Sequence, residues 1–142
     1  MTEDPRADVL LVEDDANDVA VALRAFRRHS LEDRVRVLRD GVELVDYLES
    51  RDLRARPPKL ILLDLKMPRL DGRAALRELR SRPETRHIPV VIVSSSDRQT
   101  DVKDCYELGA NSFVVKQLNP LSPGTYLVDT VRYWLDMNEV AS

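Results

Sequence analysis

The sequence has one cysteine, two histidines and no long apolar stretch, and each shortage excludes a class of protein. A lone cysteine, Cys105, forms no disulfide within one chain, so we expect a reducing compartment and a buried, unreactive thiol. No apolar stretch approaches the roughly 20 residues that a membrane-spanning helix needs. The acidic first residues lack the basic and apolar regions of a signal peptide. We therefore expect a cytoplasmic protein with no membrane partner.

An excess of positive charge is also missing. The net charge is −3, and basic residues alternate with acidic ones, so nothing indicates a nucleic-acid partner. The two histidines, His29 and His87, have no suitably spaced partner for metal or base chemistry. A length of 142 residues suits one domain, which we place over residues 1–142 with a core at about 7–138.

Short runs of Val, Ile and Leu are present, and such runs are typical of buried parallel strands. They cover 9–12, 60–63, 90–93 and 113–115, with a weaker run at 35–38. Apolar residues at helical spacing predict helices over about 16–29, after Asp40-Gly41, from Asp71-Gly72 to before Pro83, up to Gly109, and around 127–135. Residues 51–58 are predicted to form a lengthened loop. This alternation predicts an α/β fold, a doubly wound flavodoxin-like (βα)5 parallel sheet with strand order 2-1-3-4-5.

Four of the apolar runs end in polar residues of different chemical kinds. Glu13 and Asp14 follow the first, Asp64 the second, Ser94 the third and Lys116 the fourth. Ligands of open parallel sheets bind just outside the carboxyl ends of the strands. The side chains should therefore meet in one place, which suits a divalent metal and a phosphoryl group.

The carboxylates suit Mg²⁺, which prefers oxygen ligands and keeps several waters. Asp14 and Asp64 can be direct ligands, with Glu13 reaching the metal through water. The purely structural alternative for Glu13-Asp14-Asp15 is a set of acids at a helix N-terminus, which the helix dipole favours in any case. Because Asp64 follows a neighbouring strand and adds a further carboxylate, the metal site is the favoured interpretation.

Asp64 is also the candidate nucleophile, because a carboxylate can accept a phosphoryl group and form an acyl phosphate. The ammonium of Lys116 and the hydroxyl of Ser94 can then stabilise the charge on the transferred group. Alternatively, Lys116 is only a salt-bridge partner of Asp64.

In these motifs the chain resembles the receiver domains of bacterial two-component response regulators over nearly its whole length. The matching stretches are Leu11-Val12-Glu13-Asp14-Asp15, Leu62-Leu63-Asp64-Leu65-Lys66-Met67-Pro68 with Asp71-Gly72, Pro89-Val90 through Ser94-Ser95, and Gly109-Ala110-Asn111-Ser112-Phe113-Val114-Val115-Lys116. The resemblance implies that Asp64 is the phosphoacceptor and that Lys116 is the lysine of the family motif. It also implies a Mg²⁺ site, open to Mn²⁺, formed by Glu13, Asp14, Asp64 and the backbone carbonyl of Lys66.

The resemblance further implies a switch. Ser94 would turn toward the phosphoryl group, and Phe113 would turn inward to fill the vacated space. Simple core packing is the alternative for Phe113. Gln117 departs from the family pattern, in which proline usually follows the lysine.

Three features resemble stand-alone regulators paired with bacterial phytochrome histidine kinases. They are the lengthened loop at 51–58, Tyr106-Glu107-Leu108 and Tyr133-Trp134-Leu135. No output domain is expected. The resemblance implies a histidine-kinase partner and a homodimer through the fourth helix, fifth strand and fifth helix. An exposed Tyr126 or Tyr133 would fit that interface. No enzymatic activity is implied beyond the chain's own phosphotransfer and slow autodephosphorylation.

Three alternatives to a working receiver share parts of this pattern. A flavodoxin would need a loop rich in Ser, Thr and Gly after the first strand, where Glu13-Asp14-Asp15 would repel an anion. A haloacid-dehalogenase phosphatase would need an aspartate where Lys66 lies. A degenerate receiver, acting only as a binding module, is the serious rival, and uptake of beryllofluoride with Mg²⁺ would distinguish it from a working one.

Overall fold

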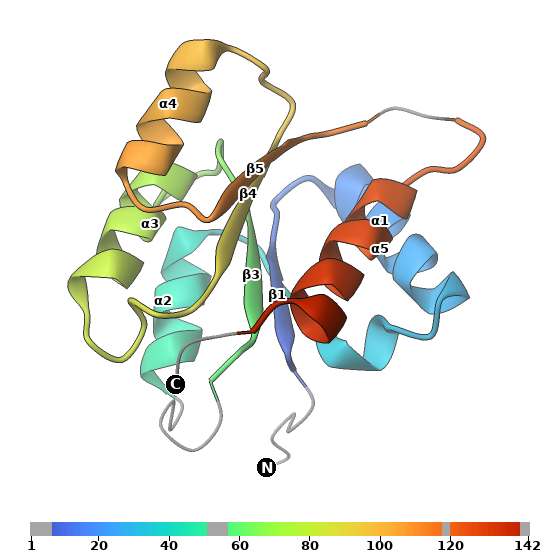
Figure 1. Ribbon diagram of the computed structural model, residues 1–142, viewed down its shortest axis with the longest axis horizontal. Coiled ribbons are helices and arrows are strands. Elements are labelled where there is room, and N and C mark those ends of the chain that lie inside the picture. Colours follow the sequence, from blue (N-terminus) through green and yellow to red (C-terminus); the bar gives the residue numbers. More distant parts are fainter. Residues whose placement is uncertain (1–6, 51–56, 118–119, 140–142) are drawn as a thin grey trace.

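The computed structural model describes residues 7–50, 57–117 and 120–139, and its centre is a five-stranded parallel sheet (Figure 1). The strand order is β2-β1-β3-β4-β5, which confirms the predicted order and fold class. The strands are β1 (Val9–Val12), β2 (Val35–Leu38), β3 (Leu60–Asp64), β4 (Val90–Ser94) and β5 (Ser112–Val115). The α-helices are α1 (Ala16–Arg28), α2 (Gly41–Glu49), α3 (Gly72–Ser81), α4 (Gln99–Glu107) and α5 (Thr125–Arg132), and a π-helical turn, Tyr133–Met137, continues α5.

Three of the helices begin where an aspartate caps them. Asp15 accepts hydrogen bonds from the backbone N–H groups of Asn17 and Asp18, at 2.9 and 3.0 Å, and so begins α1. Asp40 caps α2 and Asp71 caps α3 in the same way. A cap of this kind typically contributes about 1 kcal/mol. The structural alternative for the acidic triplet, a helix N-terminus, is therefore correct for Asp15, whose side chain caps α1.

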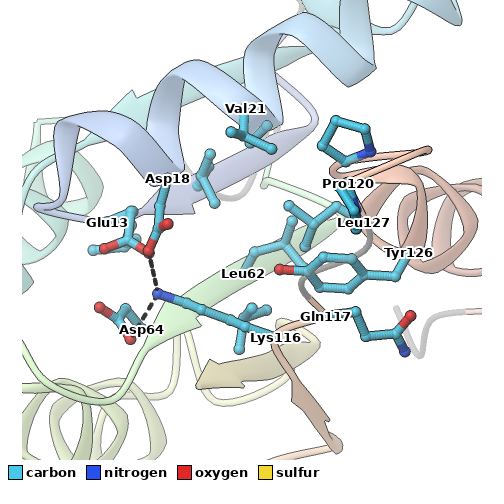
Figure 2. Close-up of a pocket in the computed structure, with 15 residues that line it drawn as sticks. Glu13, Asp18, Val21, Leu62, Asp64, Lys116, Gln117, Pro120, Tyr126 and Leu127 are labelled. Atoms are coloured by element: carbon cyan, nitrogen blue, oxygen red, sulfur yellow. Dashed lines mark hydrogen bonds and ion pairs between the residues drawn. The ribbon is translucent and has the colours of Figure 1, made fainter. Parts of the chain in front are cut away.

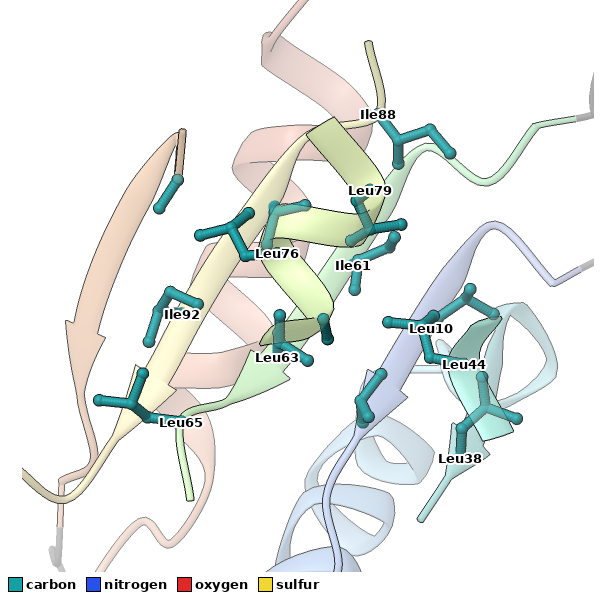
Figure 3. Packing of buried hydrophobic residues seen from close by; sticks show 14 of the residues in the cluster. Leu10, Leu38, Leu44, Ile61, Leu63, Leu65, Leu76, Leu79, Ile88 and Ile92 are labelled. Atoms are coloured by element: carbon teal, nitrogen blue, oxygen red, sulfur yellow. The ribbon is translucent and has the colours of Figure 1, made fainter. Parts of the chain in front are cut away.

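Alternating side chains of the central strands pack into two hydrophobic layers, one on each face of the sheet. Helices cover both faces (Figure 1), and Figure 3 shows side chains of the layer that contains Leu10, Leu63 and Leu76. Leu63 points toward α2, α3 and α4, whereas its neighbour Leu62 points toward α1 and α5. All residues of β1, β3 and β4 are buried. A one-residue slip in any of these strands would exchange the two layers, so the register is strongly specified.

The fifth strand is less buried than its apolar sequence predicts. Its residues are only half-buried, and Val115 is 36% exposed. The reason is position, because β5 lies at the edge of the sheet beside β4 alone. The prediction that the strand at 113–115 is buried was therefore wrong, although the strand itself was predicted correctly. Cys105 is buried as expected, and burial raises the pKa of its thiol.

The predicted lengthened loop at 51–58 falls mostly outside the described residues, which omit 51–56. Across the described ranges, no helix is both long and apolar enough to cross a membrane.

Candidate functional site

The carboxyl ends of β1, β3 and β5 bring together the acids and the lysine that the sequence singles out. Glu13 and Asp14 follow β1, Asp64 is the last residue of β3, and Lys116 follows β5. Carboxylate oxygens of Glu13, Asp14 and Asp64 all lie within 4.8 Å of one another. Glu13 and Asp64 are buried, whereas Asp14 is exposed and opens the cluster to solvent. The predicted convergence of these residues is confirmed.

Backbone contacts hold Glu13 in place. Its N–H donates to the carbonyl of Leu38 at 2.9 Å, which extends the pairing of β1 with β2. Its carboxylate accepts a hydrogen bond from the N–H of Asp15 at 3.1 Å. These two contacts hold the Glu13 side chain in place beside Asp64.

The Lys116 ammonium lies among three carboxylates (Figure 2). It donates to Glu13 at 2.7 Å and to Asp18 at 2.8 Å, and its Nζ is 3.8 Å from the nearer oxygen of Asp64. Sequence reasoning missed Asp18. A signal was available, since Asp18 lies in the first turn of the helix predicted over about 16–29, directly after the acidic triplet.

The cluster carries more negative than positive charge. Burial and the charge of Glu13 raise the pKa of Asp64 to about 7, against the smaller opposing effect of Lys116. Burial disfavours the ammonium of Lys116, but hydrogen bonds to Asp18 and Glu13 outweigh this and hold its pKa above the ordinary value. One ammonium therefore does not compensate the surrounding carboxylates.

This donor set fits a hard divalent cation. The cluster offers only oxygen ligands, from two strands, with excess negative charge and one side open to water. Mg²⁺ and Mn²⁺ prefer oxygen ligands and tolerate several waters. Lys66 is exposed in the turn after β3, and the role predicted for its backbone carbonyl stays a prediction.

Gly72, at the start of α3, shapes the turn that follows Asp64. Its N–H donates to the carbonyl of Leu65 at 2.9 Å. A Cβ at this position would lie 2.4 Å from the carbonyl oxygen of Asp64, so only glycine allows this approach. The close packing fixes the end of β3 and thus the backbone of Asp64.

The two expected switch residues lie on the neighbouring strands. Ser94 ends β4, one position beyond the partner of Asp64, and its hydroxyl accepts from the N–H of Ser96 at 3.1 Å. Ser96 in turn donates to Asp101 of α4 at 2.5 Å. Phe113 of β5 is half-buried against the α2–α3–α4 layer, so it contributes to packing in this state.

A largely apolar cavity of about 270 Å³ adjoins the acids, between α1, α5 and the sheet (Figure 2). Leu62, Val21 and Leu127 line it, and Lys116 and Tyr126 also face it. Tyr126 is half-buried against the α1–α5 layer, which corrects the expectation that it could be exposed at an interface.

Tyr133, the other tyrosine considered for an interface, is 47% exposed. Its neighbour Trp134 is partly buried against the same layer and meets the Tyr133 ring edge-on, with the ring centroids 5.3 Å apart. Tyr133 therefore remains available to a partner, whereas Trp134 contributes to the core.

Fold and site together define an α/β protein with an acidic, lysine-flanked pocket at the carboxyl edge of its sheet. The family model of the response regulator receiver domain matches residues 9–122. The chain therefore belongs to the receiver-domain family of response regulators. Over 137 residues it is 34% identical to a probable methanogenesis regulatory protein, FilR2, of Methanothrix harundinacea, covering 96% of this chain and 88% of that protein.

Phytochrome-linked regulators are also among its relatives. The response regulator Rcp1 of Synechocystis is 31% identical over 130 residues, covering 90% of this chain and 88% of Rcp1. The structure is similar to that of the phosphorylated cyanobacterial phytochrome response regulator RcpA, with a TM-score of 0.82 and 32% identity over 94% of this chain and 97% of that one. It is also similar to the Mn²⁺-bound form of Rcp1, with a TM-score of 0.80 and 29% identity over 94% and 98% of the two chains.

Proposed function

We propose that this chain is a phosphoacceptor that receives a phosphoryl group on Asp64 from a histidine kinase. The observation that carries the proposal is the setting of Asp64, a buried carboxylate within 4.8 Å of two others and 3.8 Å from the Lys116 ammonium. The relation to phosphorylated RcpA supports the same assignment.

In the proposed transfer, an ionised Asp64 oxygen forms a bond to phosphorus while the bond from phosphorus to the kinase histidine nitrogen breaks. The electron pair of that bond leaves with the imidazole. Lys116 neutralises charge on the phosphoryl oxygens and aligns the group, which is most of what phosphoryl transfer requires. The residues that would hold Mg²⁺, or Mn²⁺ in its place, are Glu13, Asp14, Asp64 and the Lys66 carbonyl. When bound, the metal supplies further neutralisation of the transferred group.

The phosphorylated form then changes its surface. Phosphorylated Asp64 carries about two negative charges and new acceptor oxygens. The hydroxyl of Ser94, which now accepts from Ser96, turns to donate to the phosphoryl group. Phe113 moves into the vacated space, and the surface of α4, β5 and α5 changes shape.

The partner proposed is a bacterial phytochrome histidine kinase, as for the related phytochrome response regulators. The chain acts as a single receiver domain in the cytoplasm, without a nucleic-acid or membrane partner. It catalyses only its own phosphotransfer and slow autodephosphorylation. A homodimer through α4, β5 and α5 would use the exposed Tyr133 beside this surface.

The test is phosphotransfer from radiolabelled histidine kinases, with phytochrome kinases first, to the wild type and to Asp64→Asn. We expect label on the wild type, none on Asp64→Asn, and none on either when divalent metal is chelated. Continued labelling of folded Asp64→Asn would rule out this acceptor. Wild type that no phosphorylated kinase and no small phosphodonor can label would identify the chain as a binding module instead.

A further inference from the structure

Asp18 makes a contact that none of the roles assigned above uses. It lies in the first turns of α1, where its carboxylate accepts from Lys116 at 2.8 Å, while Lys116 and Asp64 are 3.8 Å apart (Figure 2). The Lys116 side chain is 15% exposed and that of Asp18 is 44% exposed, so the pair is partly shielded from water.

Asp18 does not belong to the group of carboxylates that could share a cation, which comprises Glu13, Asp14 and Asp64. A cation at that group would attract Glu13 but would leave Asp18 paired with Lys116. Of the two acids that hold the ammonium, Asp18 is therefore the one that still competes for it once metal and phosphoryl group are present.

We propose that Asp18 is a positioning residue that acts through Lys116 and weakens the phosphorylated state by competing with the phosphoryl group for the ammonium. This inference rests on the proposed function of Asp64. The competition has a definite direction, because removing the Asp18 charge leaves Lys116 free to turn toward Asp64. Asp18 thus makes phosphorylation easier to reverse.

The expected effect is modest. Ion pairs of this exposure contribute about 0.2–1 kcal/mol, so at 1.36 kcal/mol per factor of ten the loss of the pair changes a competing affinity by about 1.4- to five-fold. Beryllofluoride, a phosphoryl mimic that binds at the acceptor aspartate with Mg²⁺, measures that affinity without a kinase.

The chain offers a matched control in Asp15, another acid at the start of α1. Asp15 only caps the helix, and asparagine caps as well as aspartate does. Asp15→Asn therefore removes the same charge from the same region without touching Lys116. Asp18→Glu keeps the carboxylate, and thermal unfolding verifies that each variant is folded.

Calorimetry at saturating Mg²⁺ should find beryllofluoride bound about 1.4- to five-fold more tightly by Asp18→Asn than by Asp15→Asn. Asp18→Glu should stay closer to the wild type, and affinity for Mg²⁺ alone should change equally in both asparagine variants. A purely structural role of Asp18 would not raise the affinity for beryllofluoride.

Equal or weaker beryllofluoride binding by Asp18→Asn would overturn this inference, as would an Asp18→Glu variant that behaves like Asp18→Asn. In either case, uptake by the wild type and not by Asp64→Asn would leave the proposed function standing. Failure of the wild type itself to bind beryllofluoride would overturn both.

Discussion

Replacing Asp64 by asparagine should stabilise the metal-free protein near pH 8. The folded-state pKa of about 7 lies above the ordinary 3.8, so between these values the folded protein keeps a proton that the unfolded chain has released. Raising the pH through this window therefore costs stability, and the cost is complete above about pH 7. Asparagine resembles the protonated acid in shape and charge and avoids this cost.

The pKa difference, from 3.8 to about 7, corresponds to an upper limit of about 4 kcal/mol at 1.36 kcal/mol per pH unit. Relaxation of the site and water reaching it through the exposed Asp14 reduce this value, so we expect a gain of about 2 kcal/mol. Below pH 7 the gain should shrink, and near pH 5 it should be less than half of its value at pH 8.

Urea unfolding with a chelator present, at both pH values, measures the gain as a change in free energy of unfolding. Asp71→Asn is the control, because it removes the same charge at an exposed helix cap and should give no such gain. Destabilisation by Asp64→Asn at pH 8, or a gain that is equal at the two pH values, would refute the account of crowded carboxylates.

Three further predictions concern the metal, the lysine and the turn after β3. Mg²⁺ affinity measured by calorimetry should rise by up to about tenfold per pH unit below pH 7, because the cation competes with the proton on Asp64, and a flat profile would contradict this. Lys116→Met should slow phosphoryl uptake by about 10²-fold without weakening Mg²⁺ binding, and parallel loss of metal affinity would indicate a merely structural lysine. Gly72→Ala should lower the free energy of unfolding by about 1–3 kcal/mol, because its Cβ would clash with the Asp64 carbonyl, and wild-type stability in urea would refute that clash.

Most of the fold could be predicted because local pattern and global topology agree. The runs that became β1, β3 and β4 are buried on both faces, and the residues that follow each strand lie at one edge of the sheet. Composition does not distinguish a central strand from an edge strand, however. Phe113 and Val115 look as apolar as the core, yet lack of a second neighbouring strand leaves β5 half-exposed.

The site was predicted as a set of residues but not as a set of pairs. Strand ends brought Glu13, Asp64 and Lys116 together, whereas the preference of the lysine for Asp18 over Asp64 depends on side-chain geometry that spacing does not encode. Asp15 shows the same limit. Its sequence position suits either a metal cluster or a helix cap, and only the direction of its side chain assigns it to the cap.

The most direct test of the account is to locate the phosphoryl group after transfer. Borohydride reduces an aspartyl phosphate to homoserine, so peptide mass spectrometry of the labelled and reduced protein identifies the modified residue. We predict homoserine at position 64 and unmodified aspartate at 14 and 18. Homoserine at another aspartate, or a phosphoryl group that resists borohydride on a serine or histidine, would contradict the account.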